Sequence, residues 1–357
     1  MNVEETETII IGAGPIGLEL AAALKSRGAD YIQIDAGQIG QTVWWYPRQV
    51  RFFSSPDRIA IAGLPIQTVD QSKASREEYL AYLRTVVEHY DLDVRCFERA
   101  IRIDRQDDGR LILLTRRGEH DRQYIAPHVV LAVGDMHRPR MLHIPGEDLE
   151  HVSHYFDDPH LYFRRRLLIV GGRNSAVEAA IRCHRVGAHV TLSHRREVFD
   201  SKAVKYWLLP EIEMLAKTGQ VRLLPSTVPT RITSSGVTLK HLDDPSGRTS
   251  EIEAEAVLLL TGYVMDTTLF EMAGVELEGE NRMPKHDEAT MQTNVPGVYV
   301  AGTAVGGTQQ PFKLFIENCH IHVDRITRAL TGQPPPFDAT NRTTAEFSRR
   351  IEQMPES

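Results

Sequence analysis

The sequence predicts an α/β protein built from two similar strand–turn–helix units, one placed inside the other. Two glycine-rich turns carry this prediction, because each follows a short apolar strand and opens a helix. They are Gly12-Ala13-Gly14-Pro15-Ile16-Gly17 and Gly171-Gly172-Arg173-Asn174-Ser175-Ala176. Two further apolar strands end in Gly134 and Gly262, as if each closed one unit. Turns in this context bind dinucleotides. The expected fold is two Rossmann-like domains of the three-layer ββα type.

The first unit begins with the β-branched run 8–11, which predicts a buried parallel strand. Gly12 allows the tight turn, Gly14 lets a pyrophosphate approach the backbone, and Gly17 permits close contact between helix and strand. An Ala- and Leu-rich helix follows, and the next strand ends in Asp35. This acid lies near the roughly 20-residue offset of a ribose-binding carboxylate. It favours an unphosphorylated adenosine ribose, as in FAD or NAD.

The second unit departs from the strict glycine pattern. Arg173 takes the place of the second glycine, and the next strand ends in His194-Arg195-Arg196 instead of an acid. Losing a carboxylate and gaining two arginines suits a ribose 2′-phosphate, because arginine binds phosphate in a bidentate way. We therefore expect NADPH at this site. The alternative is that both arginines are only solvated surface charges.

The remaining chain completes the two units. Residues 293–303 predict a turn, a strand and a glycine stop, and 311–330 predict a final helix whose N-terminus, around 309–313, would carry a partial positive charge. The expected domain limits are 1–137 and 265–332 for the two parts of the first dinucleotide-binding domain, 138–163 for a linker, 164–264 for the inserted NADPH domain, and 333–357 for a polar tail.

The composition of the chain argues against several classes of binding partner. The net charge of −7 over 357 residues argues against nucleic acid or an anionic membrane as a partner. The apolar run 8–24 is too glycine-rich and short for a membrane span, and the N-terminus has no secretory pattern. The three cysteines, Cys96, Cys183 and Cys319, have no C-x-x-C spacing, so structural disulfides are not expected and a cytoplasmic location fits. The histidines form no metal-ligand pattern, so no metal is expected.

These motifs resemble the two-dinucleotide-binding flavoproteins, the group of thioredoxin reductases. A closer resemblance, over about residues 8–330, is to the bacillithiol-disulfide-reductase-like family. It rests on the following segments: Tyr46-Pro47, Phe52-Phe53-Ser54-Ser55, His154-Tyr155-Phe156, the second glycine turn, and Phe315-Ile316-Glu317-Asn318. The resemblance implies FAD on the first turn, NADPH on the inserted one, hydride transfer from NADPH to flavin, and a homo-oligomer.

The motifs and the resemblance together assign the cofactor contacts. The expected FAD residues are Gly12, Gly14, Pro15, Ile16, Gly17, Asp35, Tyr46, Gly134, Gly302, Thr303 and Gln310. The expected NADPH residues are Gly171, Gly172, Arg173, Asn174, Ser175, His194, Arg195, Arg196 and Gly262. His154, Tyr155 and Cys319 are the candidates for a catalytic side chain.

Departures from the family leave the electron acceptor open. Ile16 stands where the bacillithiol family has cysteine, and Thr303 stands where thioredoxin reductases have aspartate. The resemblance favours a low-molecular-weight disulfide or a similar small acceptor. One alternative, which needs no cysteine, is an electron carrier such as ferredoxin, flavodoxin or a quinone. Another is a flavin monooxygenase, although residues 149–155 lack the Phe-x-Gly-x-x-x-His segment of that class.

Overall fold

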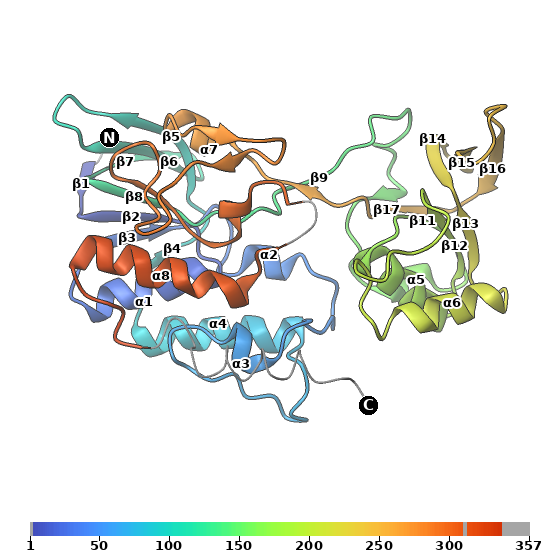
Figure 1. The fold of residues 1–357 in the computed structure, drawn as a ribbon, viewed down its shortest axis with the longest axis horizontal. Helices are drawn as coiled ribbons and strands as arrows, with labels where there is room; N and C mark the ends of the chain where they lie inside the picture. Colours follow the sequence, from blue (N-terminus) through green and yellow to red (C-terminus); the bar gives the residue numbers. More distant parts are fainter. Residues whose placement is uncertain (1–2, 310–312, 338–357) are drawn as a thin grey trace. The chain divides into compact units, whose positions relative to one another are not determined.

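The computed structural model describes residues 3–309 and 313–337, which form two compact units (Figure 1). Unit 1 contains the chain as far as Trp44, Gln49–Arg138, and the chain from Val264 onward, whereas unit 2 contains Trp45–Arg48 and Pro139–Tyr263. The chain leaves unit 1 along β9 (Arg138–Pro139) and returns along β18 (Tyr263–Val264), and these two strands pair. Unit 2 is therefore an insertion in unit 1.

Unit 1 is built on a five-stranded parallel sheet in the order β21-β8-β2-β3-β4. The strands are β2 (Thr8–Ile11), β3 (Tyr31–Ile34), β4 (Val94–Arg95), β8 (His128–Leu131) and β21 (Val298–Val300). β2 is buried along its whole length, as expected for a strand covered on both faces. Ile9 and Ile11 face a core shared with an antiparallel sheet, which has the order β1-β7-β6-β5.

That antiparallel sheet and a set of helices complete the layers of unit 1. Its strands are β1 (Val3–Glu5), β5 (Arg99–Arg105), β6 (Leu111–Arg117) and β7 (His120–Ala126). The longer helices are α1 (Pro15–Ser26), α4 (Arg76–Tyr90) and α8 (Ile316–Thr331). Figure 1 shows these three helices on the side of the parallel sheet away from β5, β6 and β7. Shorter elements are α2 (Gln41–Trp44), α3 (Pro56–Ile59), α7 (Thr268–Met272), η2 (Gly302–Gly306), β19 (Leu277–Glu278) and β20 (Met283–Pro284).

Unit 2 repeats this arrangement. Its parallel sheet has the order β10-β17-β11-β12-β13, and its antiparallel sheet has the order β14-β15-β16. Leu167 and Ile169 of β11 face the helices, whereas Leu168 and Val170 face the antiparallel sheet. The elements are β10 (Val152–Ser153), η1 (Pro159–Tyr162), β11 (Arg166–Val170), α5 (Asn174–Arg185), β12 (His189–His194), α6 (Leu209–Lys217), β13 (Arg222–Pro225), β14 (Thr227–Thr233), β15 (Gly236–His241), β16 (Thr249–Glu253) and β17 (Ala256–Leu259).

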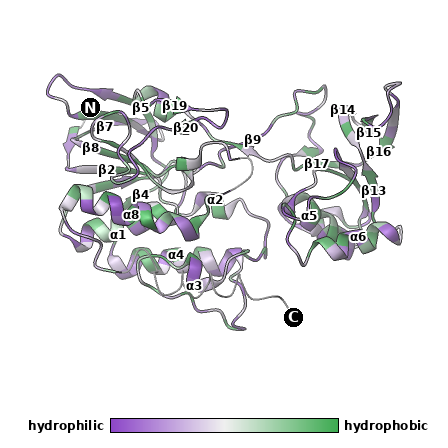
Figure 2. Ribbon diagram, viewed as in Figure 1, coloured by the Kyte–Doolittle hydropathy of each residue, from purple (hydrophilic) through white to green (hydrophobic). Residues whose placement is uncertain are grey.

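The predicted α/β class with parallel sheets is confirmed, and both units have the three layers expected of it. Figure 2 shows hydrophilic and hydrophobic positions side by side on α6 and α8, as expected for helices that cover a sheet with one face. The expected linker was 138–163, of which residues 139–163 belong to unit 2 and contribute β10 and η1 to it. Of the expected tail, residues 338–357 lie outside the part of the chain that the structure describes.

The start of the last helix was predicted wrongly. α8 begins at Ile316 with Phe315 as its N-cap residue, not near 311. Residues 313–315, which precede it, follow no helical hydrogen-bond pattern, and Gln309 Oε1 accepts the backbone N–H groups of Lys313 and Leu314. A local side-chain acceptor therefore replaces the helical hydrogen bonds in this segment.

Candidate functional site

The first glycine turn lies between β2 and α1, and its glycines are required sterically. A Cβ atom on Gly12, whose φ is +118°, would lie 2.3 Å from the Ala132 carbonyl oxygen, and one on Gly17 would lie 2.2 Å from the Gly12 oxygen. Gly14 differs, because no described atom outside its own stretch of chain lies within 4 Å of the place where its Cβ would be. The turn therefore packs tightly on both sides of an open position at Gly14.

That open position faces the uncapped start of α1. Gly14 is the N-cap residue and makes no side-chain cap, and Pro15 at the next position has no N–H to satisfy. The N–H groups of Ile16 and Gly17 therefore begin the helix and add to its positive end. Free N–H groups beside a glycine are the usual binding site for a phosphate. This geometry suits the pyrophosphate of a dinucleotide.

Asp35 fixes the turn from the end of β3. Its Oδ2 accepts the Ala13 N–H and its Oδ1 accepts the Gly37 N–H, both at 2.7 Å. Burial raises the pKa of Asp35, and these two hydrogen bonds act in the opposite direction. Each carboxylate oxygen can accept a second hydrogen bond, so Asp35 can also take ribose hydroxyls.

The other expected FAD residues of unit 1 lie at neighbouring strand ends. Gly134 follows β8, and Gly302 and Thr303 follow β21. Thr303 Oγ1 lies 3.8 Å from the position of a Cβ on Gly134. Ile16 is 6% exposed, and its side chain lies against Gly302. The structure therefore brings these residues to one edge of the sheet, and Ile16 fills a space between two glycine turns.

One further expected FAD residue belongs to the other unit, and another is not among the described residues. Tyr46 lies in the segment Trp45–Arg48, which belongs to unit 2. Gln310 lies outside the described residues. Gln309 is described, and its side chain does two things that the sequence does not indicate. It holds the segment before α8 and it donates to Asp135 Oδ2 at 2.9 Å.

The second glycine turn has the same place in unit 2, between β11 and α5. Gly171 has a φ of +153°, and a Cβ on Gly172 would lie 2.0 Å from the ring of His194. His194 is buried at the end of β12 and stacks on Phe199, with ring centroids 5.0 Å apart. Burial and the nearby arginines lower the pKa of His194, so its ring is neutral at neutral pH. A neutral ring covers one side of the turn.

Arg173 is the N-cap residue of α5 and makes no side-chain cap. Its side chain is exposed, as are Ser175, Arg195 and Arg196. Arg196 forms an ion pair with Asp200 at 3.1 Å. Three exposed arginines and an uncapped helix start therefore gather around the carboxyl ends of β11 and β12. This set of groups fits a phosphate-rich ligand.

Asn174 is part of a contact that the sequence did not reveal. Its Oδ1 accepts the Lys205 N–H at 2.7 Å, and Lys205 Nζ lies 3.3 Å from Glu178 Oε2. Both contacts fasten the segment around Lys205 to the first turns of α5. The spacing in sequence is too long for a local motif, so only the fold brings these groups together.

The two polar candidates after β10 lie in unit 2. His154 has two ring nitrogens without a hydrogen-bond partner among the described residues, and its Nε2 lies 3.6 Å from Glu147 Oε1. The ring of Tyr155 lies 6.0 Å from that of Trp45 and 5.9 Å from that of Tyr263. Tyr263 follows Gly262, which is exposed and has a φ of +100°. An aromatic cluster therefore borders the carboxyl end of β17.

Burial disfavours the reactive thiolate form of all three cysteines. Cys183 and Cys319 have no exposed surface, and burial raises the pKa of Cys183 to about 12 and that of Cys319 further. Burial also raises the pKa of Cys96, which follows β4 and donates to Gln38 Oε1. A thiol reacts as its thiolate, so a raised pKa suppresses its reactivity.

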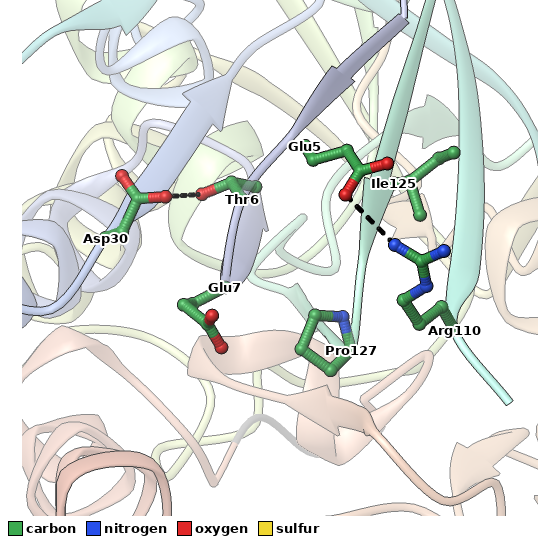
Figure 3. Close-up of a pocket in the computed structure, with 7 residues that line it drawn as sticks. All are labelled: Glu5, Thr6, Glu7, Asp30, Arg110, Ile125 and Pro127. Atoms are coloured by element: carbon green, nitrogen blue, oxygen red, sulfur yellow. Dashed lines mark hydrogen bonds and ion pairs between the residues drawn. The ribbon is translucent and has the colours of Figure 1, made fainter. Parts of the chain in front are cut away.

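Other kinds of site find little support in the part of the chain that the structure describes. No cluster of three or more potential metal ligands occurs there, and no helix there is both long and apolar enough to cross a bilayer. A surface depression of about 310 Å³ is lined by Glu5, Glu7, Asp30 and Arg110, among others (Figure 3). It lies where β2 and β8 begin, whereas nucleotides bind where such strands end.

Comparison with known proteins identifies the family. The family model described as pyridine nucleotide-disulphide oxidoreductase matches residues 9–302. The chain belongs to this family. It is therefore an enzyme, a flavin oxidoreductase that uses a pyridine nucleotide.

Individual relatives agree with the expected resemblance. Bacilliredoxin reductase Bdr of Bacillus subtilis is 33% identical over 90% of this chain and 96% of its own. The structure of bacillithiol disulfide reductase Bdr from Bacillus cereus has a TM-score of 0.86 and 32% identity, covering 92% of this chain and 99% of its own. A ferredoxin–NADP reductase of Ignicoccus hospitalis is 25% identical over 83% of this chain and 89% of its own. The resemblance predicted from the motifs is confirmed.

Proposed function

We propose that this enzyme binds FAD in unit 1 and NADPH in unit 2, and reduces a low-molecular-weight disulfide or a small redox-protein acceptor without a thiol of its own. FAD, when bound, takes a hydride from NADPH and passes electrons to the acceptor. The observation that carries the proposal is the pair of glycine turns, each with an uncapped helix start.

The residues of unit 1 fit FAD. The open position at Gly14 leaves room for a pyrophosphate beside the N–H groups of α1, and Asp35 is held with acceptor capacity to spare. The Asp35 carboxylate accepts the backbone N–H groups of Ala13 and Gly37. A carboxylate here disfavours a 2′-phosphate and favours the plain ribose of FAD.

The residues of unit 2 fit NADPH better than NADH. Arg195 and Arg196 follow β12 at the position of the ribose-binding residue, and both are exposed. A 2′-phosphate would attract both guanidinium groups, and it would compete with Asp200 for Arg196. The 2′-hydroxyl of NADH carries no charge and would not attract these guanidinium groups. The two arginines therefore select the phosphorylated nucleotide.

The state of the cysteines supports electron delivery without an enzyme thiol. All three have raised pKa values, and Cys183 and Cys319 have no exposed surface. Ile16 supplies no sulfur at the first turn. The relatives named as disulfide or bacilliredoxin reductases support a disulfide acceptor. The relative named as a ferredoxin–NADP reductase supports an iron–sulfur carrier as the second candidate.

An acceptor screen tests this proposal. Purified protein should carry a flavin spectrum, and NADPH should bleach it faster than NADH under anaerobic conditions. The reduced protein is then mixed with small disulfides, a ferredoxin, a quinone or oxygen, in parallel with the variant Cys96→Ser/Cys183→Ala/Cys319→Ala. We expect that variant to keep at least half of the turnover with the best acceptor. Loss of turnover with retained bleaching would show that a thiol is required.

The remaining expectations are a cytoplasmic location and a homo-oligomer. The low cysteine content without C-x-x-C spacing supports the location. The resemblance to the thioredoxin-reductase group supports the oligomer. Light scattering coupled to size exclusion gives the mass in solution, and a mass of one chain, 40.3 kDa, would contradict the oligomer.

A further inference from the structure

A buried polar cluster lies at the carboxyl edge of the parallel sheet in unit 1, made of Asp135, Thr303 and Gln309. Asp135 is 7% exposed and Gln309 is 6% exposed. Gln309 Nε2 donates to Asp135 Oδ2 at 2.9 Å, and the Thr303 side chain also hydrogen-bonds the Asp135 carboxyl. Residues distant in sequence therefore meet around one buried carboxyl group.

The Gln309 side chain has a fixed orientation. Its Oε1 accepts the N–H groups of Lys313 and Leu314, at 2.9 and 2.8 Å, and its Nε2 donates to the Leu314 carbonyl at 3.1 Å. Because the oxygen accepts two backbone donors, the nitrogen must face Asp135 as a donor. The chain also makes room for this side chain at Gly306, where a Cβ would lie 2.9 Å from Gln309 carbon atoms. Asp135 is thus built to present acceptor oxygens.

A buried carboxyl group is costly unless its acceptor capacity is used. The two oxygens of a carboxylate accept about four hydrogen bonds, and Gln309 and Thr303 supply two side-chain donors. Burial raises the pKa of Asp135, against the effect of these two donors. A group of this kind at a strand end is typical of a ligand site rather than of a stable core.

The position of the cluster in the sheet limits which part of a bound FAD it could contact. β8 lies between β2 and β21 in the sheet, so Asp135 lies between the Gly12 turn and the Gly302 turn. The pyrophosphate site is at the Gly12 turn and the start of α1. In FAD, a polyol chain with vicinal hydroxyl groups joins the pyrophosphate to the ring. Carboxylate, hydroxyl and amide groups are suitable partners for such hydroxyls.

We propose that Asp135, Thr303 and Gln309 bind the polyol chain of FAD, with the Asp135 carboxylate accepting a hydroxyl hydrogen bond and Gln309 holding that carboxylate in place. The inference rests on the proposed function, because it needs FAD in unit 1. It adds Asp135 and Gln309 to the binding site, and it gives Thr303 a specific partner.

FAD affinity tests the role of Asp135. FAD is removed, and reconstitution is followed by flavin fluorescence for the wild type, Asp135→Asn and Thr303→Val. Losing a hydrogen bond to a charged group corresponds to a loss of about tenfold to a hundredfold in affinity, which we expect for Asp135→Asn. The matched control is Glu147→Gln, which also removes a buried carboxylate but lies in unit 2 and contacts backbone N–H groups. It should keep the wild-type affinity for FAD.

Deoxy analogues of FAD test the contact itself. FAD analogues that each lack one polyol hydroxyl are titrated into the wild type and into Thr303→Val. This variant keeps the Asp135 carboxylate, and it replaces Asp135→Asn in the test if that variant does not fold. One analogue should bind the wild type at least tenfold more weakly than FAD, and this discrimination should shrink in the variant. Equal binding of all analogues by the wild type would overturn the proposal.

A carboxylate introduced at a neighbouring position should restore part of the FAD affinity. Asp135→Asn/Thr303→Asp moves the carboxylate to the neighbouring strand end, and it should regain at least part of the affinity that Asp135→Asn loses. Wild-type affinity in Asp135→Asn would overturn the proposal while leaving the proposed function intact. Failure of the wild type to bind FAD would instead overturn the proposed function. The two failures are therefore distinguishable.

Discussion

Arg195 and Arg196 illustrate how single side chains can set the choice of nucleotide. Both are exposed beyond β12, and Arg196 already pairs with Asp200. We predict that Arg195→Ala/Arg196→Ala raises the KM for NADPH about tenfold or more and leaves that for NADH nearly unchanged. The reason is that phosphate contacts are made equally in the bound and reacting states, so kcat should change little. Stopped-flow bleaching of the flavin at varied nucleotide concentration measures both constants.

The control for this pair is Arg185→Ala. Arg185 is an exposed arginine of the same unit that pairs with Glu211 on α6, away from the strand ends. It should leave the KM for NADPH unchanged. If the double variant still prefers NADPH as strongly as the wild type, the arginines are only solvated surface charges.

Gly172 is a second position where one added carbon atom is expected to change NADPH binding. A Cβ there would lie 2.0 Å from the His194 ring, which is itself held against Phe199. We predict that Gly172→Ala displaces His194 and raises the KM for NADPH severalfold, with no change in FAD content. Gly219→Ala is the control for backbone strain alone, because its φ is +72° but its Cβ would meet open space and displace no side chain. An unchanged KM in Gly172→Ala would mean that His194 does not shape the nucleotide site.

Between helices, a buried ion pair joins α1 to α8. His320 Nδ1 lies 2.7 Å from Glu19 Oε2, and Nε2 lies 3.2 Å from the Arg58 carbonyl oxygen, so both ring nitrogens face acceptors. Burial opposes the charge on the ring, but Glu19 and these hydrogen bonds outweigh it and raise the pKa of His320 above 6.5. The contribution to stability is therefore complete below pH 6.5 and is lost as the pH rises through the folded-state value.

We predict that His320→Gln lowers the free energy of unfolding by about 3–5 kcal/mol at pH 6, because it leaves Glu19 buried without its charged partner. The loss should shrink as the pH rises above neutrality. Urea unfolding from pH 6 to 9, with saturating FAD, measures it. His184→Gln is the matched control, since His184 is a surface residue of α5 that contacts Gln220. A loss that is constant over this pH range would mean that the ring is not charged in the native protein.

Local patterns predicted the helices and strands that depend on neighbours in sequence, and missed those that depend on distant contacts. The turns at Gly12 and Gly171 and the strands before them were evident, because strand, turn and helix are consecutive. The start of α8 was misplaced because Gln309, outside the helix, takes the backbone N–H groups that a helix would use. The contact of Asp135 with Gln309 joins residues 174 positions apart in the chain, so no local spacing reveals it.

The chain as a whole separates into units that each have their own core. Core residues of unit 2 come from β11, β12 and β17 with α5, α6 and β14–β16, and the core of unit 1 is built from its own two sheets. β9 and β18 pair side by side, so the chain enters and leaves unit 2 at adjacent positions. Adjacent strands lie about 5 Å apart, and a short linker can span that distance.

We therefore predict that joining Arg138 to Val264 through a short Gly/Ser linker, with residues 139–263 removed, leaves a protein that folds and binds FAD. Its affinity for FAD should stay within about tenfold of the full chain, a change of 1.4 kcal/mol. It should not be bleached by NADPH, because Arg195, Arg196 and the second glycine turn are gone. Chemical reduction by dithionite is the control, since it needs no nucleotide site. Bleaching of the shortened protein by NADPH would place the NADPH site in unit 1. It would contradict the assignment of FAD to the first glycine turn and of NADPH to the second.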